Sequence, residues 1–300
     1  MRIKNNPKIF YLACGLLAEG DRRYDSDDAE IAALAEKIQK AAPEASLDAE
    51  ILQWFNLAKT GQVEKNPYWP RGHAMMMATL FLNGKELDID HFVEFMETVN
   101  MQDPIGEEEF RQWLGRLPEV LAYTENVFRG LWKEYCKIMF VRTNSWMPEI
   151  EASRKPLKEF FGRGNIPNLV MLPNLFAGPF AADFVRQGDD IIMIACKPDI
   201  ERILQEALRD IIAKYEEKIA AFYEERDDDE PVTQECFVHA LSTILAGGGE
   251  GRVQAHVNCG FANLPAIIKY FEKHRPDADN LGDFIDIVLK GMVETNEKDC

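Results

Sequence analysis

The chain has 300 residues, of which 46% are hydrophobic and 28% are charged, and this composition is typical of a globular protein rather than a disordered one. Its formal net charge of −17 repels phosphate backbones and anionic membrane surfaces, which argues against nucleic acid and membranes as partners. The most apolar stretches, such as residues 74–82, are much shorter than the ~20 residues that span a bilayer.

The first half of the chain is predicted to consist of consecutive helices. Apolar residues recur there at spacings of three and four, which is the pattern of helices with one buried face. The expected helices cover residues 8–19, 27–41, 47–59, 70–82, 88–98, 106–114 and 116–138.

The composition changes near residue 145, where Pro, Gly and Asn become more frequent. Two short strands are predicted beyond this point, "NLVMLP" at 168–173 and the apolar run at 190–196. One long helix is expected over 199–223, because Pro198 stands before a continuous apolar stripe.

Further helices are expected towards the end of the chain, from Pro231 to the glycines near 247, and over 262–274 and 280–296. The glycine-rich stretch 246–252 lacks the Lys-Ser/Thr of a phosphate-binding loop and is interpreted as a flexible helix terminus. The sequence therefore predicts an α+β fold that is predominantly helical, with a helical region at 1–145 and a small sheet with packed helices at 146–300.

Six cysteines are scattered along the chain without a C-x-x-C pair. Several lie on apolar faces, where a cysteine behaves as a small hydrophobic residue. We therefore expect a reduced, cytoplasmic protein.

One stretch of the expected helix 199–223, "RILQEALRDIIAKY" at 202–215, has a functional interpretation. Gln205, Glu206 and Arg209 have the spacing of the H-E-x-x-H motif, in which two histidines one turn apart bind zinc and the glutamate activates water. Glu235 follows Glu206 by 29 residues on the next expected helix.

The order of a strand, a helix with this spacing and a second helix with a glutamate resembles the gluzincin branch of the zincin metallopeptidases. The resemblance covers residues 146–300. It implies that Glu206 stands at the general-base position, that Gln205 and Arg209 stand at the positions of two zinc ligands, and that Glu235 stands at the third.

The two histidines themselves are absent, and this changes the expected chemistry. Gln205 offers a poor zinc ligand, and the guanidinium of Arg209 has no lone pair to donate. A positive charge at about 4 Å repels a dication by roughly 8 kcal/mol at an effective dielectric constant near 20. We therefore expect no zinc or other cofactor, and a catalytically inactive zincin-like protein that binds a peptide or protein.

Two alternatives remain open at this stage. The first is a metal-dependent hydrolase with an atypical site built from Glu206, Glu235 and His239, which stands one turn after Glu235. The second is a helical interaction protein unrelated to zincins, in which Leu204, Ala207 and Leu208 belong to the core stripe of an ordinary amphipathic helix.

A specific contact is expected if the zincin interpretation is correct. Glu206 and Glu235 would face each other without a metal, and two like charges in contact either take up a proton or recruit a cation. Arg209 lies three residues after Glu206 on the same helix, within side-chain reach. We therefore predict that Arg209 binds Glu235, Glu206 or both.

Overall fold

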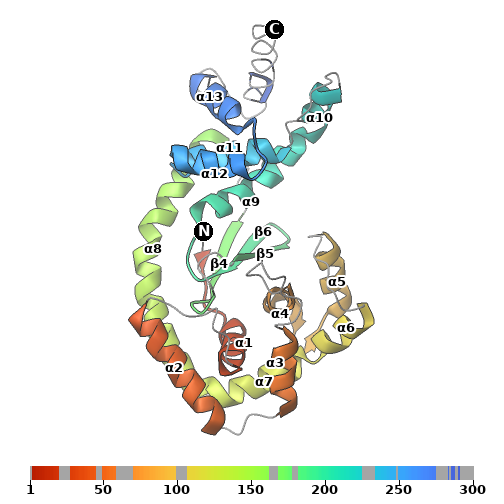
Figure 1. Cartoon of the computed structure of the whole chain (residues 1–300), viewed down its shortest axis with the longest axis vertical. Coiled ribbons are helices and arrows are strands. Elements are labelled where there is room, and N and C mark those ends of the chain that lie inside the picture. Colours follow the sequence, from red (N-terminus) through yellow and green to blue (C-terminus); the bar gives the residue numbers. More distant parts are fainter. Residues whose placement is uncertain are drawn as a thin grey trace.

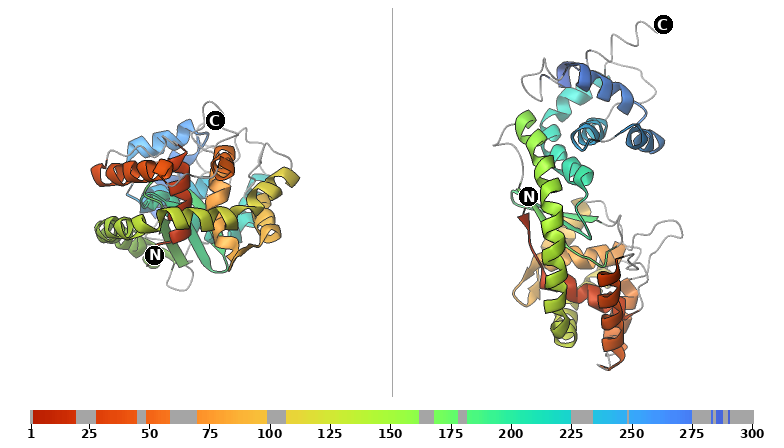
Figure 2. Two further views of the ribbon diagram at one scale, coloured as in Figure 1. Left: turned by 90° about the horizontal axis from the view of Figure 1, so that it is seen from below. Right: turned by 90° about the vertical axis from the view of Figure 1, so that its left-hand side faces the viewer.

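A small sheet separates two groups of helices (Figure 1). The computed structural model describes residues 2–19, 28–44, 49–58, 70–98, 107–161, 168–177, 182–224, 234–247, 249–274, 283, 285–287 and 290. Helices α1 to α7 lie on one side of the sheet and α9 to α13 on the other, and the long helix α8 runs beside both groups (Figure 2). The predominantly helical α+β fold expected from the sequence is confirmed.

The first six helices of the chain begin and end within a few residues of their predicted bounds, and the seventh, α7, begins close to its predicted start. They are α1 (Pro7–Ala18), α2 (Ala29–Glu44), α3 (Ala49–Ala58), α4 (Pro70–Ala78), α5 (Ile89–Thr98), α6 (Glu107–Gly115) and α7 (Leu117–Phe128). A 3-10 turn, η2 (Thr79–Phe81), ends α4, and the short strands β2 (Leu82–Asn83) and β3 (Glu86–Leu87) form a hairpin around Gly84, whose φ is 66°.

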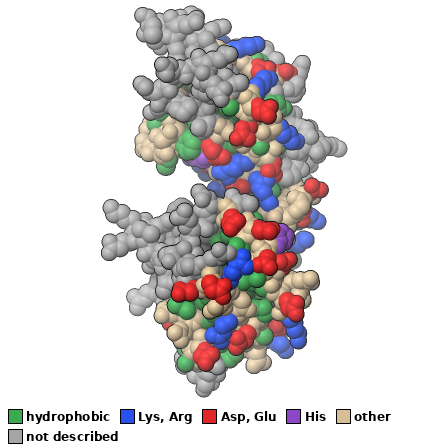
Figure 3. All heavy atoms as spheres, turned by 90° about the vertical axis from the view of Figure 1, so that its right-hand side faces the viewer, with side chains coloured by type: hydrophobic (Ala, Val, Ile, Leu, Met, Phe, Trp, Pro, Cys, Tyr) green, Lys and Arg blue, Asp and Glu red, His purple; other side chains and the backbone are tan. Residues whose placement is uncertain are grey.

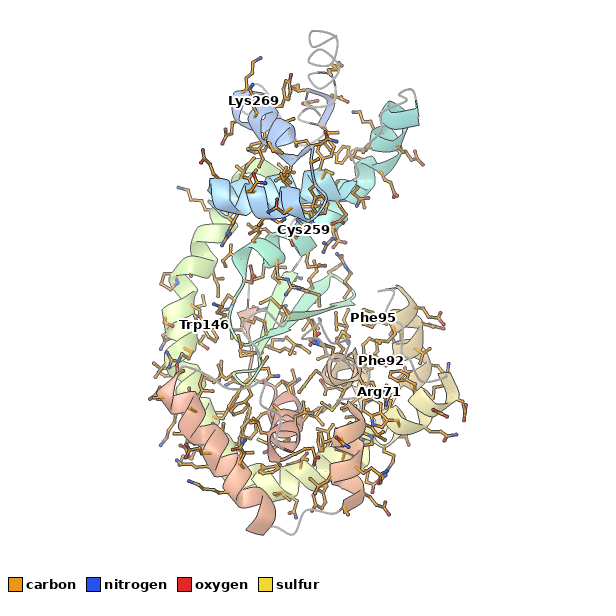
Figure 4. The ribbon with its side chains drawn as sticks, viewed as in Figure 1. Arg71, Phe92, Phe95, Trp146, Cys259 and Lys269 are labelled. Carbon is orange, nitrogen blue, oxygen red and sulfur yellow. The ribbon has the colours of Figure 1, made fainter. Side chains whose placement is uncertain are left out.

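The predicted helix 116–138 is wrong in its extent. It divides into α7 and α8 (Trp132–Phe161), with the 3-10 turn η3 (Arg129–Leu131) between them. The change in composition near 145 falls inside α8, which continues through Pro148. Ile150 is buried and Trp146 packs towards the sheet (Figure 4), so tertiary packing outweighs the cost of a proline within the helix.

The main sheet has the strand order β1-β4-β6-β5. The two predicted strands are confirmed as β4 (Asn168–Pro173) and β6 (Asp190–Ala195), which are parallel neighbours. Two further strands were not predicted. The N-terminal β1 (Arg2–Ile3) pairs parallel to β4, so residues from both predicted regions build this sheet, and β5 (Ala182–Gln187) pairs antiparallel to β6 at the end of the sheet.

Both faces of the sheet are buried, which explains why β4 and β6 are continuously apolar. Alternate residues pack against the core of the N-terminal helices, namely Val170, Leu172, Val185, Ile192 and Ile194. The other face packs against Ile203 and Ala207 of α9 (Ile200–Ile212). The sheet therefore fixes the position of α9, the helix that carries Gln205, Glu206 and Arg209.

The predicted helix 199–223 is also wrong in one respect, because it is not continuous. After α9 come the 3-10 turn η4 (Ala213–Tyr215) and then α10 (Glu216–Glu224). None of the three residues of η4 is buried, so packing does not hold this turn in α-helical geometry.

The remaining helices are α11 (Gln234–Leu245), α12 (Glu250–Asn258) and α13 (Leu264–His274). The stretch 246–252, interpreted as a helix terminus, also contains the start of α12. The predicted helix start at 231–233 lies outside the described residues, as does most of the predicted helix 280–296. In the described part of the chain, no helix combines the length and the apolarity needed to cross a membrane.

We predict that Gly15→Ala lowers the free energy of unfolding by about 2 kcal/mol, because a methyl group at Gly15 of α1 would overlap the Phe55 ring of α3. Thermal or urea unfolding measures this loss. Gly115→Ala in α6 is the control, because no atom of the described residues lies within 4 Å of the added methyl group there. Equal effects of the two substitutions would contradict the close packing of α1 on α3.

Candidate functional site

Helices α9 and α11 form a tightly packed pair on the side of the sheet away from α1. Their apolar residues share one core, which includes Leu204 and Leu208 of α9 and Phe237 and Leu241 of α11. The polar residues of the two helices meet along one side of this core, and these are the residues of the zinc-motif interpretation.

Three side chains of α9, each four residues from the next, pair with three side chains of α11 at the same spacing. We call this row the polar ladder; its pairs are Glu201 with Thr243, Gln205 with His239, and Arg209 with Glu235. The pairing order is opposite in the two helices, so α9 and α11 run antiparallel. A spacing of four residues places side chains on one face of a helix, which explains how both rows remain in register over two turns.

Arg209 makes the strongest contacts of the ladder. Its Nε donates to Oε1 of Glu235 at 2.9 Å and its Nη2 donates to Oε2 of Glu235 at 3.1 Å, while its Nη1 donates to Glu206. The prediction that Arg209 would bind Glu235, Glu206 or both is confirmed, because it binds both. Two parallel hydrogen bonds to one carboxylate fix the orientation of the guanidinium, in addition to the attraction between the two charges.

The negative charges of Glu206 and Glu235 stabilise the charged form of Arg209. Burial by itself lowers the pKa of Arg209, but the hydrogen bonds to Glu235 and the charges of Glu206 and Glu235 outweigh burial, so the pKa is raised above its ordinary value. The Glu206 side chain is 16% exposed and the Glu235 side chain 40% exposed. Glu206 is therefore the inner carboxylate and Glu235 the outer one.

Strand β5 adds a second arginine to the same place. Arg186 donates from Nη2 to the carbonyl oxygen of Glu206 at 3.2 Å, lies 3.6 Å from the Glu206 carboxylate and also pairs with Asp210. Arg186 was not among the predicted site residues, because no pattern in the sequence predicted β5. Figure 3 shows basic and acidic side chains interspersed over one face of the molecule, as they are in this cluster.

The middle pair of the ladder joins an amide to a neutral imidazole. Gln205 Nε2 donates to His239 Nδ1 at 3.2 Å, and His239 Nε2 lies 3.7 Å from Glu235. Burial lowers the pKa of His239 from 6.5 to about 4, and the neighbouring His256 acts in the same direction, outweighing the opposite effects of Glu235 and Glu201. His239 is therefore neutral at pH 7 and accepts the hydrogen bond from Gln205.

Helix α12 contacts the other end of the ladder. His256 Nε2 lies 2.6 Å from Glu201 Oε1, and Arg252 lies 2.9 Å from the other oxygen of Glu201. The rings of His256 and His239 lie 4.6 Å apart, and the Phe261 ring packs on His239 at 4.2 Å. The ladder therefore continues from α9 and α11 to α12.

These residues do not fit a zinc ion in the arrangement that H-E-x-x-H provides. Arg209, which has no lone pair, lies between the two carboxylates, and the amide nitrogen of Gln205 faces His239. Among the described residues, no group of three or more His, Cys, Asp and Glu side chains has an arrangement that could hold a metal ion. These residues instead form the polar ladder, a row of hydrogen bonds and ion pairs between α9 and α11.

A second buried polar pair lies on the opposite face of β5. His73 of α4 pairs through Nδ1 with Asp183, and both side chains are only 12% exposed. The methionines that follow His73, namely Met75, Met76 and Met77, are buried core residues. The pair joins residues 110 positions apart in the chain, and no sequence pattern connects them.

Comparison of the chain with protein-family models, curated proteins and solved structures found no significant match.

We predict that Arg209→Ala lowers the free energy of unfolding by about 3 kcal/mol, because it leaves Glu206 and Glu235 close together without their shared cation. Chemical denaturation measures the loss. Arg129→Ala is the matched control: its side chain is 70% exposed and its pair with Glu125 is expected to contribute about 0.5 kcal/mol or less. In a double-mutant cycle, Glu235→Ala should cost less in the Arg209→Ala background than alone, and additive losses would show that the two residues do not interact.

We predict a loss of stability in acid that depends on His239. Between pH 6.5 and about 4 the unfolded state binds a proton at this histidine and the folded state does not, so the free energy of unfolding falls as pH decreases through that range. The loss attributable to His239 should reach about 3 kcal/mol.

The measurement compares unfolding of the wild type and His239→Gln at pH 7, 6, 5 and 4. The wild type should lose more stability than the variant over this range, because other groups contribute equally to both. His91→Gln is the control, since the His91 side chain is 66% exposed. Parallel curves for the wild type and His239→Gln would contradict the buried, neutral state of His239.

Proposed function

We propose that this chain is a catalytically inactive, zincin-like protein that binds a peptide or protein partner. In this proposal α9 corresponds to the helix that carries H-E-x-x-H in gluzincins, and α11 to the helix that carries the third zinc ligand. Arg209 then replaces the metal as the positive charge between Glu206 and Glu235.

The contact of Arg209 with both carboxylates is the observation that carries the proposal. In an ordinary amphipathic helix, an arginine on the polar flank need not contact carboxylates of the same and the next helix. Two facing carboxylates that have lost a shared dication, by contrast, require another positive charge between them. Arg209 occupies the position of the second histidine and binds the residue at the third-ligand position through Nε and Nη2 of its guanidinium.

The order of the elements gives independent support. A buried strand, β6, leads directly into α9 through Pro198 and Asp199, and Asp199 caps the helix by accepting a hydrogen bond from the Arg202 backbone N–H. The outer helix α11 then brings Glu235 back to α9. This is the order of strand and helices that the resemblance to gluzincins implies.

The end strand β5 supports a peptide as the partner. Within the described residues, β5 pairs with a strand only on its β6 side, and a free strand edge is where an extended peptide adds to a sheet. Arg186 and Gln187 near its end are exposed, and Arg186 connects this edge to Glu206. An extended peptide along β5 would therefore pass beside Arg209, Glu206 and Glu235.

The metal-dependent alternative is less well supported by the same contacts. A metal held by Glu206, Glu235 and His239 would require Arg209 to leave both carboxylates. The displaced guanidinium would remain on the same helix and repel the ion.

We predict that protein purified without added metal contains no stoichiometric zinc and retains casein-derived peptides without cleaving them. Metal analysis after dialysis, mass spectrometry of the peptides and peptide retention on immobilised protein provide the three measurements. Stoichiometric zinc that is lost in Glu235→Ala would support the metal-dependent alternative instead. Failure to retain any peptide would contradict the binding role.

The same prediction extends to a designed variant. Gln205→His combined with Arg209→His should bind one zinc ion per chain, because both imidazoles and Glu235 would then face one point. The matched control is Gln254→His with Asn258→His, which places two histidines at the same spacing on an exposed face of α12. Zinc affinity at least about tenfold higher in the first variant would support the zincin-like geometry, and equal affinities would contradict it.

A further inference from the structure

Helix α12 differs from its neighbours in how it is attached to the protein. None of its residues is buried. The partly buried Val253 makes its apolar contact with the core that α9 and α11 share. Helix α11 beneath it buries most of its residues. A helix with so little buried apolar surface separates from its neighbours at a small cost in free energy.

The polar contacts of α12 converge on one carboxylate. Arg252 and His256 stand four residues apart on α12 and both bind Glu201, whose side chain is 12% exposed. Glu201 also accepts a hydrogen bond from Thr243 of α11, so it stays bound to α11 when α12 is absent. The attachment of α12 to α9 and α11 therefore depends on Glu201, on Val253 and on the contact between the His256 and His239 rings, and α12 also lies beside α13.

Glycines stand at both ends of α12. Gly247, with φ of 69°, ends α11, Gly249 is the N-cap residue of α12 without a side-chain cap, and Gly260, with φ of 102°, follows its last turn. Among the described residues, no atom lies within 4 Å of the position of a Cβ at any of these three glycines. Glycine at these positions therefore gives the backbone at both ends of α12 conformational freedom. Figure 4 labels Cys259, which lies between the end of α12 and Gly260.

We propose that α12 is a hinged cover that opens and closes over the Glu201 end of the polar ladder, with its hinges near Gly247 and Gly260. In the closed state, α12 shields Glu201 and His239. Opening exposes this carboxylate and imidazole to solvent together.

Hydrogen exchange of the full chain, followed by mass spectrometry, tests the cover. Amides of α12 should exchange through a local opening, at a rate that low concentrations of urea leave unchanged, while amides of α11 should exchange much more slowly and accelerate with urea. Glu201→Gln weakens both contacts of α12 and should raise its exchange rate by about tenfold or more, with little change in α11. Glu272→Gln, at an exposed position of α13, is the control and should change neither helix.

A second variant keeps the test decisive if Glu201→Gln fails to fold. Arg252→Ala removes one contact from a side chain that is 53% exposed, so it should raise α12 exchange severalfold without affecting the core. Exchange of α12 and α11 at the same rate, with the same dependence on urea, would overturn the proposal. So would exchange of α12 that is unchanged by both substitutions.

Discussion

The contact of Arg209 with Glu206 and Glu235 is the interaction on which the polar side of the α9–α11 pair depends. It neutralises two carboxylates that belong to different helices. Its two parallel hydrogen bonds to Glu235 also set the register of α9 against α11. The pair of Gln205 with His239 lies one helical turn from the Arg209–Glu235 pair, and the pair of Glu201 with Thr243 lies one turn further. A shift of one turn between the helices would break all three pairs at once.

The ladder is held in place by apolar packing that it does not itself provide. Ile203 and Ala207 of α9 lie on one face of the sheet, and Leu204 and Leu208 pack against α11. These four residues occupy two adjacent stripes of one helix, so Gln205 and Arg209 are left on the flank between the sheet and α11. The hydrophobic pattern therefore positions the polar residues, and charge pairing then selects their partners.

The sequence pattern predicted the strands at 168–173 and 190–196 and most helices, because each has a long periodic or continuous apolar signal. It did not predict β1, which has only two residues, or β5, where Asp183, Arg186 and Gln187 interrupt the apolar residues. The contacts of Arg186 and the His73–Asp183 pair were therefore invisible in the sequence. The Arg209 contact was predictable from the spacing of Glu206, Arg209 and Glu235 along two expected helices, whereas the contacts of α12 with Glu201 and His239 arise only from tertiary packing.

Under the zincin-like proposal, the arginines take the place of the metal's positive charge. Arg209 contributes one positive charge to Glu206 and Glu235, and Arg186, which also pairs with Asp210, brings a second to this cluster from β5. Unlike a metal, however, each guanidinium is tied to its own backbone, so the charges cannot be lost by dissociation. Such a site keeps α9, α11 and β5 together at any metal concentration.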